Sequence, residues 1–349
     1  MGSLLTRLTK IFRGSPLYYE RIEGVRFGIH QLDFLSLNLP PICNYHCDFC
    51  FIPRASENPT HHTEIHKNSL TMDEYTSLIR DARALGVCHI EISGEGEPDL
   101  PLFRPILTHI IRTATVLGIH TTVFVNGSWL DENLLHFLKD TDSSVAVSIK
   151  YTDPEKYNRS VGIRDAYRHV ERNLETARLA LGGYAELKGC HVYRLAINST
   201  ILKNNEEDNL RLRRYCEERD IFFHASTLIP RGKTEGATID RARQDALSRE
   251  LSMSSIITAA SSRDSLGFPV CGTFYYGLGI NYDGQVLFDA HADDSLGIIG
   301  NVREIGLTEA VRRQQALRDA FYHEGGISYC PLRDIRYPNF INQYGKETQ

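Results

Sequence analysis

The stretch Cys43-Asn44-Tyr45-His46-Cys47-Asp48-Phe49-Cys50, here called the cysteine loop, places three cysteines within eight residues, directly after an apolar run at residues 34–39. Short apolar runs of this kind are typical of buried β-strands. A closed structural zinc site needs four nitrogen or sulfur ligands, and His46 is the nearby candidate for the fourth. Three cysteines that hold a cubane iron–sulfur cluster instead leave one iron without a protein ligand. The spacing is compatible with both kinds of metal site.

Strand-like runs alternate with helical patterns after this loop. Further strands are predicted at residues 88–93, 121–126, 144–150, 192–200 and 221–228. The clearest helical pattern begins with a capping box of Thr71 and Glu74 and ends before Gly86. Other helices are predicted at residues 103–117, 132–139, 165–181 and 206–219. Six strand–helix units in series predict an α/β fold, a partial (β/α)6 TIM-like barrel of parallel strands whose functional residues lie at the carboxyl ends.

The character of the sequence changes after Pro230-Arg231-Gly232. Residues 233–267 are polar and favour helices, and Tyr282-Asp283-Gly284 separates apolar runs at 274–281 and 285–288, which predicts a β-hairpin. A further helix is predicted at residues 307–321. We therefore expect three parts: an N-terminal helical or extended arm (1–32), the barrel (33–235) and a small α+β domain (236–349).

The composition excludes several classes of protein. The chain has 349 residues, a formal net charge of −5 and a pI of about 6.3. A nucleic-acid partner held by phosphate contacts needs a basic face, so no such partner is expected. No run approaches the roughly 18 apolar residues of a membrane-spanning helix, so no membrane partner is expected either. The cysteines are unevenly placed and no secretion signal precedes them, which indicates a reducing, cytoplasmic environment.

The spacing Cys43-x3-Cys47-x2-Cys50 after the first strand of a predicted barrel resembles the radical S-adenosylmethionine (SAM) superfamily. The resemblance implies a [4Fe-4S] cluster held by these three cysteines, with the amino and carboxylate groups of SAM on the fourth iron. It also implies an electron donor such as flavodoxin or ferredoxin, and a 5′-deoxyadenosyl radical that takes hydrogen from a C–H bond. Phe49 matches the family's position beside the adenine.

The segment Ser93-Gly94-Glu95-Gly96-Glu97-Pro98 begins where the second predicted strand ends and resembles the family's Gly-Gly-Glu-Pro segment, which holds the SAM amino group. Glu95 stands between the two glycines, so Gly96-Glu97-Pro98 is the closer match. The resemblance implies further SAM-binding residues at the ends of later strands: Asn126, Ser148, Lys150 and Asn198. Lys150 departs from the small or acidic residue common in the family, and a substrate contact is its alternative role.

The C-terminal region resembles the SPASM domain, or its short twitch form, which carries an auxiliary iron–sulfur cluster. Cys271 is followed by 12 residues, Gly284, four residues and Asp289, and Cys330 comes later. Asp289 stands where the pattern has its second cysteine. The resemblance implies a second cluster held by Cys271, Asp289 and Cys330, with His291, Asp293 or Asp294 in reserve. A twitch-like fold without a cluster is the alternative.

The type of reaction stays open between oxidation, epimerisation and rearrangement. Oxidation needs an electron acceptor such as the auxiliary cluster, whereas epimerisation needs a thiol hydrogen donor, for which the candidates are Cys88, Cys190 and Cys216. A buried structural role is the alternative for each thiol. We expect a small-metabolite substrate of the sugar, aminoglycoside or nucleoside type, because about 32 residues before the first strand leave little room for a leader-binding domain. A ribosomally made peptide and a non-catalytic, metal-stabilised binding protein are the alternatives.

Overall fold

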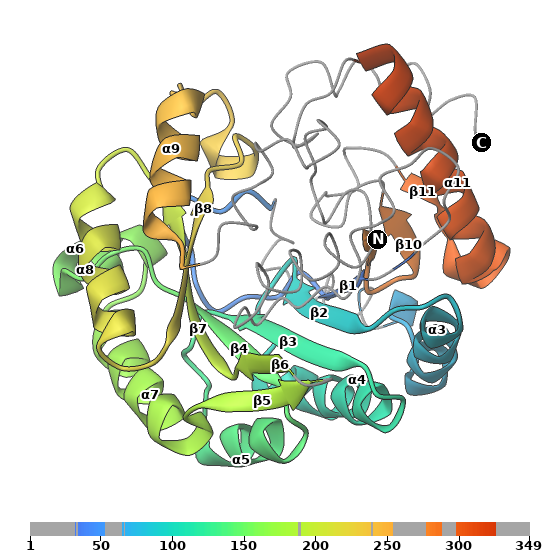
Figure 1. Ribbon diagram of the computed structural model, residues 1–349, viewed down its shortest axis with the longest axis horizontal. Helices are drawn as coiled ribbons and strands as arrows, with labels where there is room; N and C mark the ends of the chain where they lie inside the picture. The colour runs from blue at the N-terminus through green and yellow to red at the C-terminus, as the bar shows by residue number, and fades with distance from the viewer. Residues whose placement is uncertain are drawn as a thin grey trace.

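The computed structural model describes residues 32, 34–52, 65, 67–187, 190–238, 240–253, 277–287 and 298–325. Six parallel neighbours form the body of its main sheet: β1 (Phe34–Leu39), β2 (His89–Gly94), β3 (His120–Val125), β4 (Ser144–Ser148), β7 (Leu195–Ile201) and β8 (Phe222–Thr227). The strand order of the whole nine-stranded sheet is β11-β10-β9-β1-β2-β3-β4-β7-β8. The sheet curves between its edge strands β8 and β11 (Figure 1), which confirms the predicted partial barrel.

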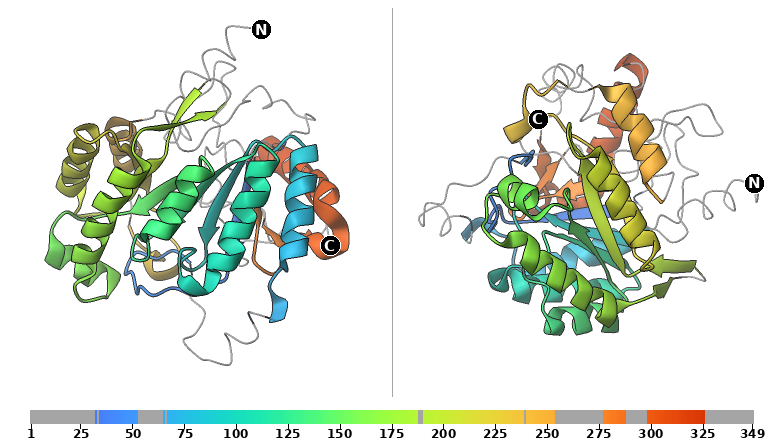
Figure 2. Two further views of the ribbon diagram at one scale, coloured as in Figure 1. Left: turned by 90° about the horizontal axis from the view of Figure 1, so that it is seen from below. Right: turned by 90° about the vertical axis from the view of Figure 1, so that its left-hand side faces the viewer.

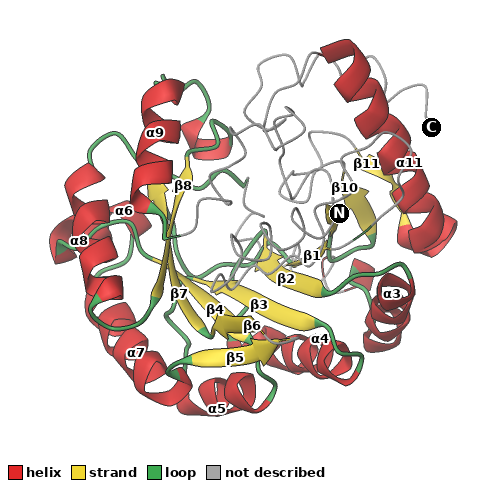
Figure 3. Cartoon of the chain, in the orientation of Figure 1, coloured by secondary structure: helices red, strands yellow, loops and turns green. Residues whose placement is uncertain are grey.

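Helices cover the outer face of this sheet (Figures 2 and 3). They are α3 (Met72–Ala84), α4 (Arg104–Val116), α5 (Glu132–Asp140), α6 (Pro154–Val161), α7 (Ala166–Leu181), α8 (Glu206–Glu217) and α9 (Arg241–Leu251), with 3-10 turns η1 (Pro101–Phe103) and η2 (Gly232–Thr234). The capping box predicted for the first of them is present, because Thr71 Oγ1 accepts from Glu74 N and the Glu74 carboxylate accepts from Thr71 N. In the described part of the chain, no helix has the length and apolar character needed to cross a membrane.

The two faces of the sheet differ in polarity. Apolar side chains on the outer face pack in one buried cluster with α3 and α4; they include Leu35, Leu37, Ile90 and Ile92. Polar side chains occupy the alternate, inward positions: Ser36, Asn38, Glu91 and Ser93. Asn38 accepts a hydrogen bond from Ser93 Oγ at 2.9 Å and donates one to Asn281 Oδ1 at 2.9 Å. The barrel therefore has an apolar outer layer and a polar inner wall along β1 and β2.

The predicted hairpin is confirmed and extends the barrel sheet. β9 (Gly277–Ile280) and β10 (Gln285–Leu287) are antiparallel on either side of the Asp283-Gly284 turn, and β10 pairs with β11 (Ile298–Asn301). β9 also pairs in parallel with β1. The C-terminal strands thus continue the sheet beyond β1. The periodicity of the sequence did not indicate that β9 is the neighbour of β1.

Two local predictions were incomplete. The single strand expected at 192–200 is wrong, because β6 (Cys190–Tyr193) ends before Arg194 and pairs with β5 (Tyr184–Leu187) in a separate two-stranded sheet. Helix α6 was not predicted, although its start has the expected chemistry. Asp153 caps it, Pro154 occupies its first turn and Gly162 ends it in the left-handed conformation at φ 68°.

The last described helix, α11 (Val302–Gly325), is interrupted at Gly306, whose φ of 71° and ψ of 164° are not helical. The regular helix after this break agrees with the start predicted at Leu307. Arg303, before the break, lies 2.5 Å from Glu74 and donates to the carbonyl groups of Asn68, Ser69 and Asp283. One guanidinium group therefore joins the C-terminal strands to the start of α3.

This junction predicts a pH-dependent contribution to stability. Contact with the Arg303 guanidinium lowers the pKa of Glu74 from 4.5 to about 2. The folded state therefore gains stability above pH 4.5 and loses it as the pH falls towards 2. Since both side chains are about one-third exposed, we expect Glu74→Gln to lower the free energy of unfolding at pH 7 by about 1 kcal/mol or less.

Urea unfolding of both proteins at pH 7 and pH 3 measures this contribution, and the difference between them should shrink at the lower pH. Asp73→Asn, in the same helical turn, is the matched control. An equal difference at both pH values would contradict the assignment.

Candidate active site

The cysteine loop begins just after β1, at the carboxyl end of the parallel strands (Figure 1). Cys43, Cys47 and Cys50 are reduced and partly exposed. Tyr45 N donates to Cys43 Sγ at 3.4 Å, and Cys50 N donates to the Cys47 carbonyl at 3.5 Å, so local turns bring the three thiols onto one short loop. This is the end of the barrel at which functional groups were expected.

The Gly-Glu-Pro segment lies directly against the base of this loop. Glu97 N donates to the Ile42 carbonyl at 2.8 Å. A Cβ atom added to Gly96 would lie 2.1 Å from that same carbonyl oxygen, so only glycine permits this approach. The two motifs predicted to form one site are therefore in contact, although more than 50 residues separate Ile42 from Glu97 in the sequence.

Asn126 supports the same loop from the end of β3. Its Nδ2 donates to Asn44 Oδ1 at 2.9 Å, and Asn44 in turn donates to Ser128 Oγ at 2.9 Å. The backbone N–H of Asn126 donates to Glu97 Oε2 at 2.8 Å. Asn126, expected to contact SAM, thus has its side-chain amide bound to the cysteine loop.

Two segments that the sequence analysis did not single out hold the outer side of the loop. His46 N donates to the Val161 carbonyl and Asp48 N to the Ser160 carbonyl, both at 2.8 Å, so the end of α6 binds the loop backbone. Lys233 N donates to the Cys50 carbonyl at 3.0 Å, next to Gly232 at φ 55°. Gly162 and Gly232 were the available indications, because both allow a close backbone approach.

Two buried carboxyl groups lie beside the loop. Burial raises the pKa of Glu97 well above its usual value, and the charges of Asp99 and Cys43 raise it further. Burial also raises the pKa of Asp99 to about 6. A positively charged ligand that entered here would favour the ionised carboxylates and would be bound by them. The pair is therefore suited to an ammonium group.

Lys150 follows the end of β4. Its side chain is 4% exposed, its Nζ atom lies 5.1 Å from the centre of the Phe49 ring, and it donates to Ser148 Oγ. Burial lowers the pKa of Lys150 to about 8, against the opposite effect of Cys47, Cys50 and Glu97. The structure thus brings Lys150, Ser148 and Phe49 together beside the thiols.

Asn198 is placed at the same level of the barrel. It is the register partner of Ser148 on β4 and of His224 on β8. Its Oδ1 atom is buried and has no hydrogen-bond partner within the described ranges. This oxygen can accept a hydrogen bond from a bound molecule.

Comparison with known proteins identifies this arrangement. Residues 37–183 match the family model of the radical SAM superfamily. The chain contains a radical SAM domain. A probable GTP 3′,8-cyclase of Pyrobaculum aerophilum is 31% identical over 137 residues, which are 39% of this chain and 41% of the cyclase. An S-adenosylmethionine-dependent nucleotide dehydratase of Lacinutrix mariniflava is 29% identical over 183 residues, 52% of this chain and 36% of the dehydratase.

A solved structure shares the fold. Streptococcus suis SuiB, crystallised with its precursor peptide SuiA, superposes with a TM-score of 0.55 at 18% identity, over 74% of this chain and 60% of SuiB. The chain spans less than half the length of the two curated relatives.

The residues of this radical SAM domain fit the cofactors that the family implies. The family implies a [4Fe-4S] cluster and SAM, and three thiols on one loop provide the sulfur ligands for a cluster with one open iron. The buried Glu97 and Asp99 carboxyl groups beside the loop suit the ammonium group of an amino acid.

The candidate hydrogen-donor cysteines belong to three different elements or their ends. Cys88 precedes β2, at the amino end of the strands, whereas the cysteine loop follows their carboxyl ends. Cys216 is buried in α8, and burial raises its pKa. Cys190 begins β6, outside the main sheet. Cys88 thus lies at the opposite end of β2 from the cysteine loop, and Cys216 lies in the helical layer; the hydrogen donor stays a prediction.

The proposed auxiliary ligands lie outside the described residues, so that site stays a prediction. They are Cys271, Asp289 and Cys330, with His291, Asp293 and Asp294. The described parts of the region are the hairpin β9–β10, whose Gly284 has a φ of 86°, together with β11 and α11.

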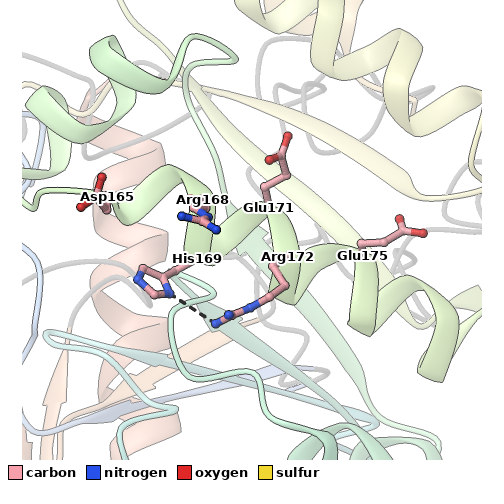
Figure 4. A pocket seen from close by; sticks show the side chains of 6 residues that line it. All are labelled: Asp165, Arg168, His169, Glu171, Arg172 and Glu175. Carbon is pink, nitrogen blue, oxygen red and sulfur yellow. Dashed lines mark hydrogen bonds between the residues drawn. The ribbon is translucent and has the colours of Figure 1, made fainter.

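A surface pocket lies along the first turns of α7 (Figure 4). It is lined by Asp165, Arg168, His169, Glu171, Arg172 and Glu175. Arg172 donates to His169 Nδ1 at 3.3 Å (Figure 4). Its alternating charges are typical of a solvated helix face, and it adds nothing to the radical SAM site.

The contact at Gly96 predicts a site-specific loss. Because its added methyl group would overlap the Ile42 carbonyl, Gly96→Ala should displace the cysteine loop and lower the rate of 5′-deoxyadenosine formation by about 10²-fold. Product analysis and iron content measure the effect after anaerobic reconstitution.

Gly118→Ala is the control, because its φ of 67° imposes backbone strain while no atom lies within 4 Å of the added carbon. It should lower the melting temperature slightly and keep its iron. Full activity of Gly96→Ala would show that the two motifs do not depend on this contact.

Proposed function

We propose that the protein is a radical SAM enzyme that reductively cleaves SAM and abstracts a hydrogen from a C–H bond of a small metabolite. The observation that carries this proposal is the contact of the cysteine loop with Gly96-Glu97 at the carboxyl ends of β1 and β2. When bound, the cluster supplies the electron that converts SAM into methionine and a 5′-deoxyadenosyl radical.

Each part of the site has a binding or orienting task in this proposal. Cys43, Cys47 and Cys50 hold the cluster. Glu97, together with Asp99, receives the SAM amino group, and the absence of a side chain at Gly96 lets that group approach the backbone. The remaining SAM-binding residues stay predictions: Phe49, Gly94, Pro98, Asn126, Ser148, Lys150 and Asn198.

A nucleoside-type metabolite is the favoured substrate within the proposed class. The two curated relatives are named as a GTP 3′,8-cyclase and a nucleotide dehydratase, so their names refer to nucleotides. The inner barrel wall carries Asn38, Ser93 and Asn281, which suit a hydroxylated or heterocyclic molecule. A peptide substrate is the second candidate, because SuiB was crystallised with a precursor peptide.

Two further features belong to this proposal. A flavodoxin or ferredoxin supplies the electron, and Cys271, Asp289 and Cys330 hold an auxiliary cluster in a twitch-like domain at 236–349, after the barrel at 33–235. Carboxylate is a harder ligand than thiolate but still binds iron. An auxiliary cluster would accept the electron that an oxidised substrate leaves behind.

Anaerobic reconstitution tests the reaction. Wild-type protein, reduced in the presence of SAM, should release 5′-deoxyadenosine, whereas Cys47→Ala should release almost none because the cluster lacks a ligand. The iron content should be about eight atoms per chain with both clusters as cubanes, and about four without the auxiliary one. Asp48→Asn, an exposed change in the same loop, should retain activity.

Equal nucleoside release by wild type and Cys47→Ala, or purification with zinc in place of iron, would overturn the proposal. A folded protein that binds metal but never cleaves SAM would support the non-catalytic alternative.

Deuterated candidate substrates test the substrate class. Incubation with deuterated nucleosides or nucleotides should transfer label from a C–H position into 5′-deoxyadenosine, which mass spectrometry detects. Label that comes only from a deuterated peptide would favour the second candidate. Unlabelled sugars and aminoglycosides added as competitors rank the remaining metabolites by their suppression of the transfer.

A further inference from the structure

The carboxyl end of β4 holds Lys150 in one place. Asn205, fully buried at the start of α8, donates from Nδ2 to the carbonyl of Lys150 at 3.1 Å and to the carbonyl of Thr200 at 2.8 Å. The neighbouring Thr152 donates from both N and Oγ1 to Asp208 on α8, at 2.9 and 2.6 Å. These hydrogen bonds to residues of α8 therefore fix the backbone at Lys150.

The side chain of Lys150 is also held along its length. It lies across the Phe49 ring, with Nζ 5.1 Å from the ring centre, and Nζ donates to Ser148 Oγ. A cation over an aromatic face is attracted by the ring quadrupole, most strongly where water is excluded. Because Lys150 is 4% exposed, its ammonium group is largely shielded from bulk water. The ammonium group of Lys150 therefore stays beside Phe49, the residue before Cys50.

Burial of an ammonium group costs free energy unless a negative partner lies nearby. The negative groups that act most strongly on Lys150 are Cys47, then Cys50, then Glu97. Two of the three are the thiols that would hold the cluster. Their thiolates would therefore lie close enough to Lys150 to interact with its charge.

We propose that Lys150 is a positioning residue that balances the negative charge of the iron–sulfur cluster and thereby raises its reduction potential. This inference rests on the proposed function, because it requires a cluster on Cys43, Cys47 and Cys50. It differs from the expected role of Lys150 as a SAM contact, since the charge acts on the cluster itself and does so before SAM binds.

The physical basis is the change in charge on reduction. Three thiolates and the cluster core carry a net negative charge, which increases by one unit when an electron is added. A fixed positive charge in a low-dielectric site stabilises the reduced form more than the oxidised form. Lysine suits this task because its ammonium group is a compact point charge. Removal of the charge should therefore make reduction harder.

A redox titration of reconstituted protein without SAM, followed by electron paramagnetic resonance, tests this role. Lys150→Gln and Lys150→Met should each lower the reduced-to-oxidised ratio at fixed potential by about ten-fold, a shift of about 59 mV for one electron. Lys150→Arg retains the positive charge and should restore most of the wild-type potential. Lys139→Gln, an exposed change in the last turn of α5, should leave the potential unchanged.

The outcomes separate this inference from the proposed function. An unchanged midpoint potential in both neutral variants, with weaker SAM binding by calorimetry, would overturn the inference and make Lys150 a SAM ligand. A wild-type protein without a [4Fe-4S] spectrum would overturn the proposed function instead. Iron content and thermal unfolding identify a variant that loses its cluster by misfolding. Should both neutral variants do so, an Arg variant with the wild-type potential would support the role, and one with a potential lowered by about 59 mV would contradict it.

Discussion

The site depends on one backbone contact, the hydrogen bond from Glu97 N to the carbonyl of Ile42. It joins the loop that carries the thiols to the segment that carries the buried carboxyl groups, and Gly96 makes it possible because any side chain would collide with Ile42. The parallel pairing of β1 with β2 places the two segments at the same sheet edge. The pairing of these two strands therefore brings the metal ligands next to the ammonium-binding groups.

Charged groups of both signs are buried beside the cysteine loop. Burial raises the pKa of Glu97 and of Asp99. Lys150 is buried as well. Isolated buried charges are costly, and natural proteins keep them where a ligand or cofactor compensates them. The lysine suits a negatively charged cluster, and the carboxyl groups suit an ammonium group.

Much of the fold and part of the site followed from local patterns. Apolar runs predicted β1, β2, β3 and β8 within one or two residues, because apolar side chains recur along these strands and pack against the helices. The Asp283-Gly284 pair predicted the hairpin because its turn needs positive φ. The β5–β6 pair was missed because the run at 192–200 contains no glycine or proline to mark the break at Arg194. Helix α6 was missed although Pro154 and Gly162 mark its ends.

The sequence by itself determined the chemistry available: three thiols at a spacing that leaves one iron open, and a strand–helix alternation that predicts a barrel. The tertiary structure decided which distant groups contact or lie beside that loop. Asn126 binds it through Asn44, the end of α6 binds it through Val161, and the cation of Lys150 lies beside it. It also decided that β9 joins β1 and not a separate sheet. The physical reason is that periodicity and capping act over a few residues, whereas these contacts depend on how whole elements pack.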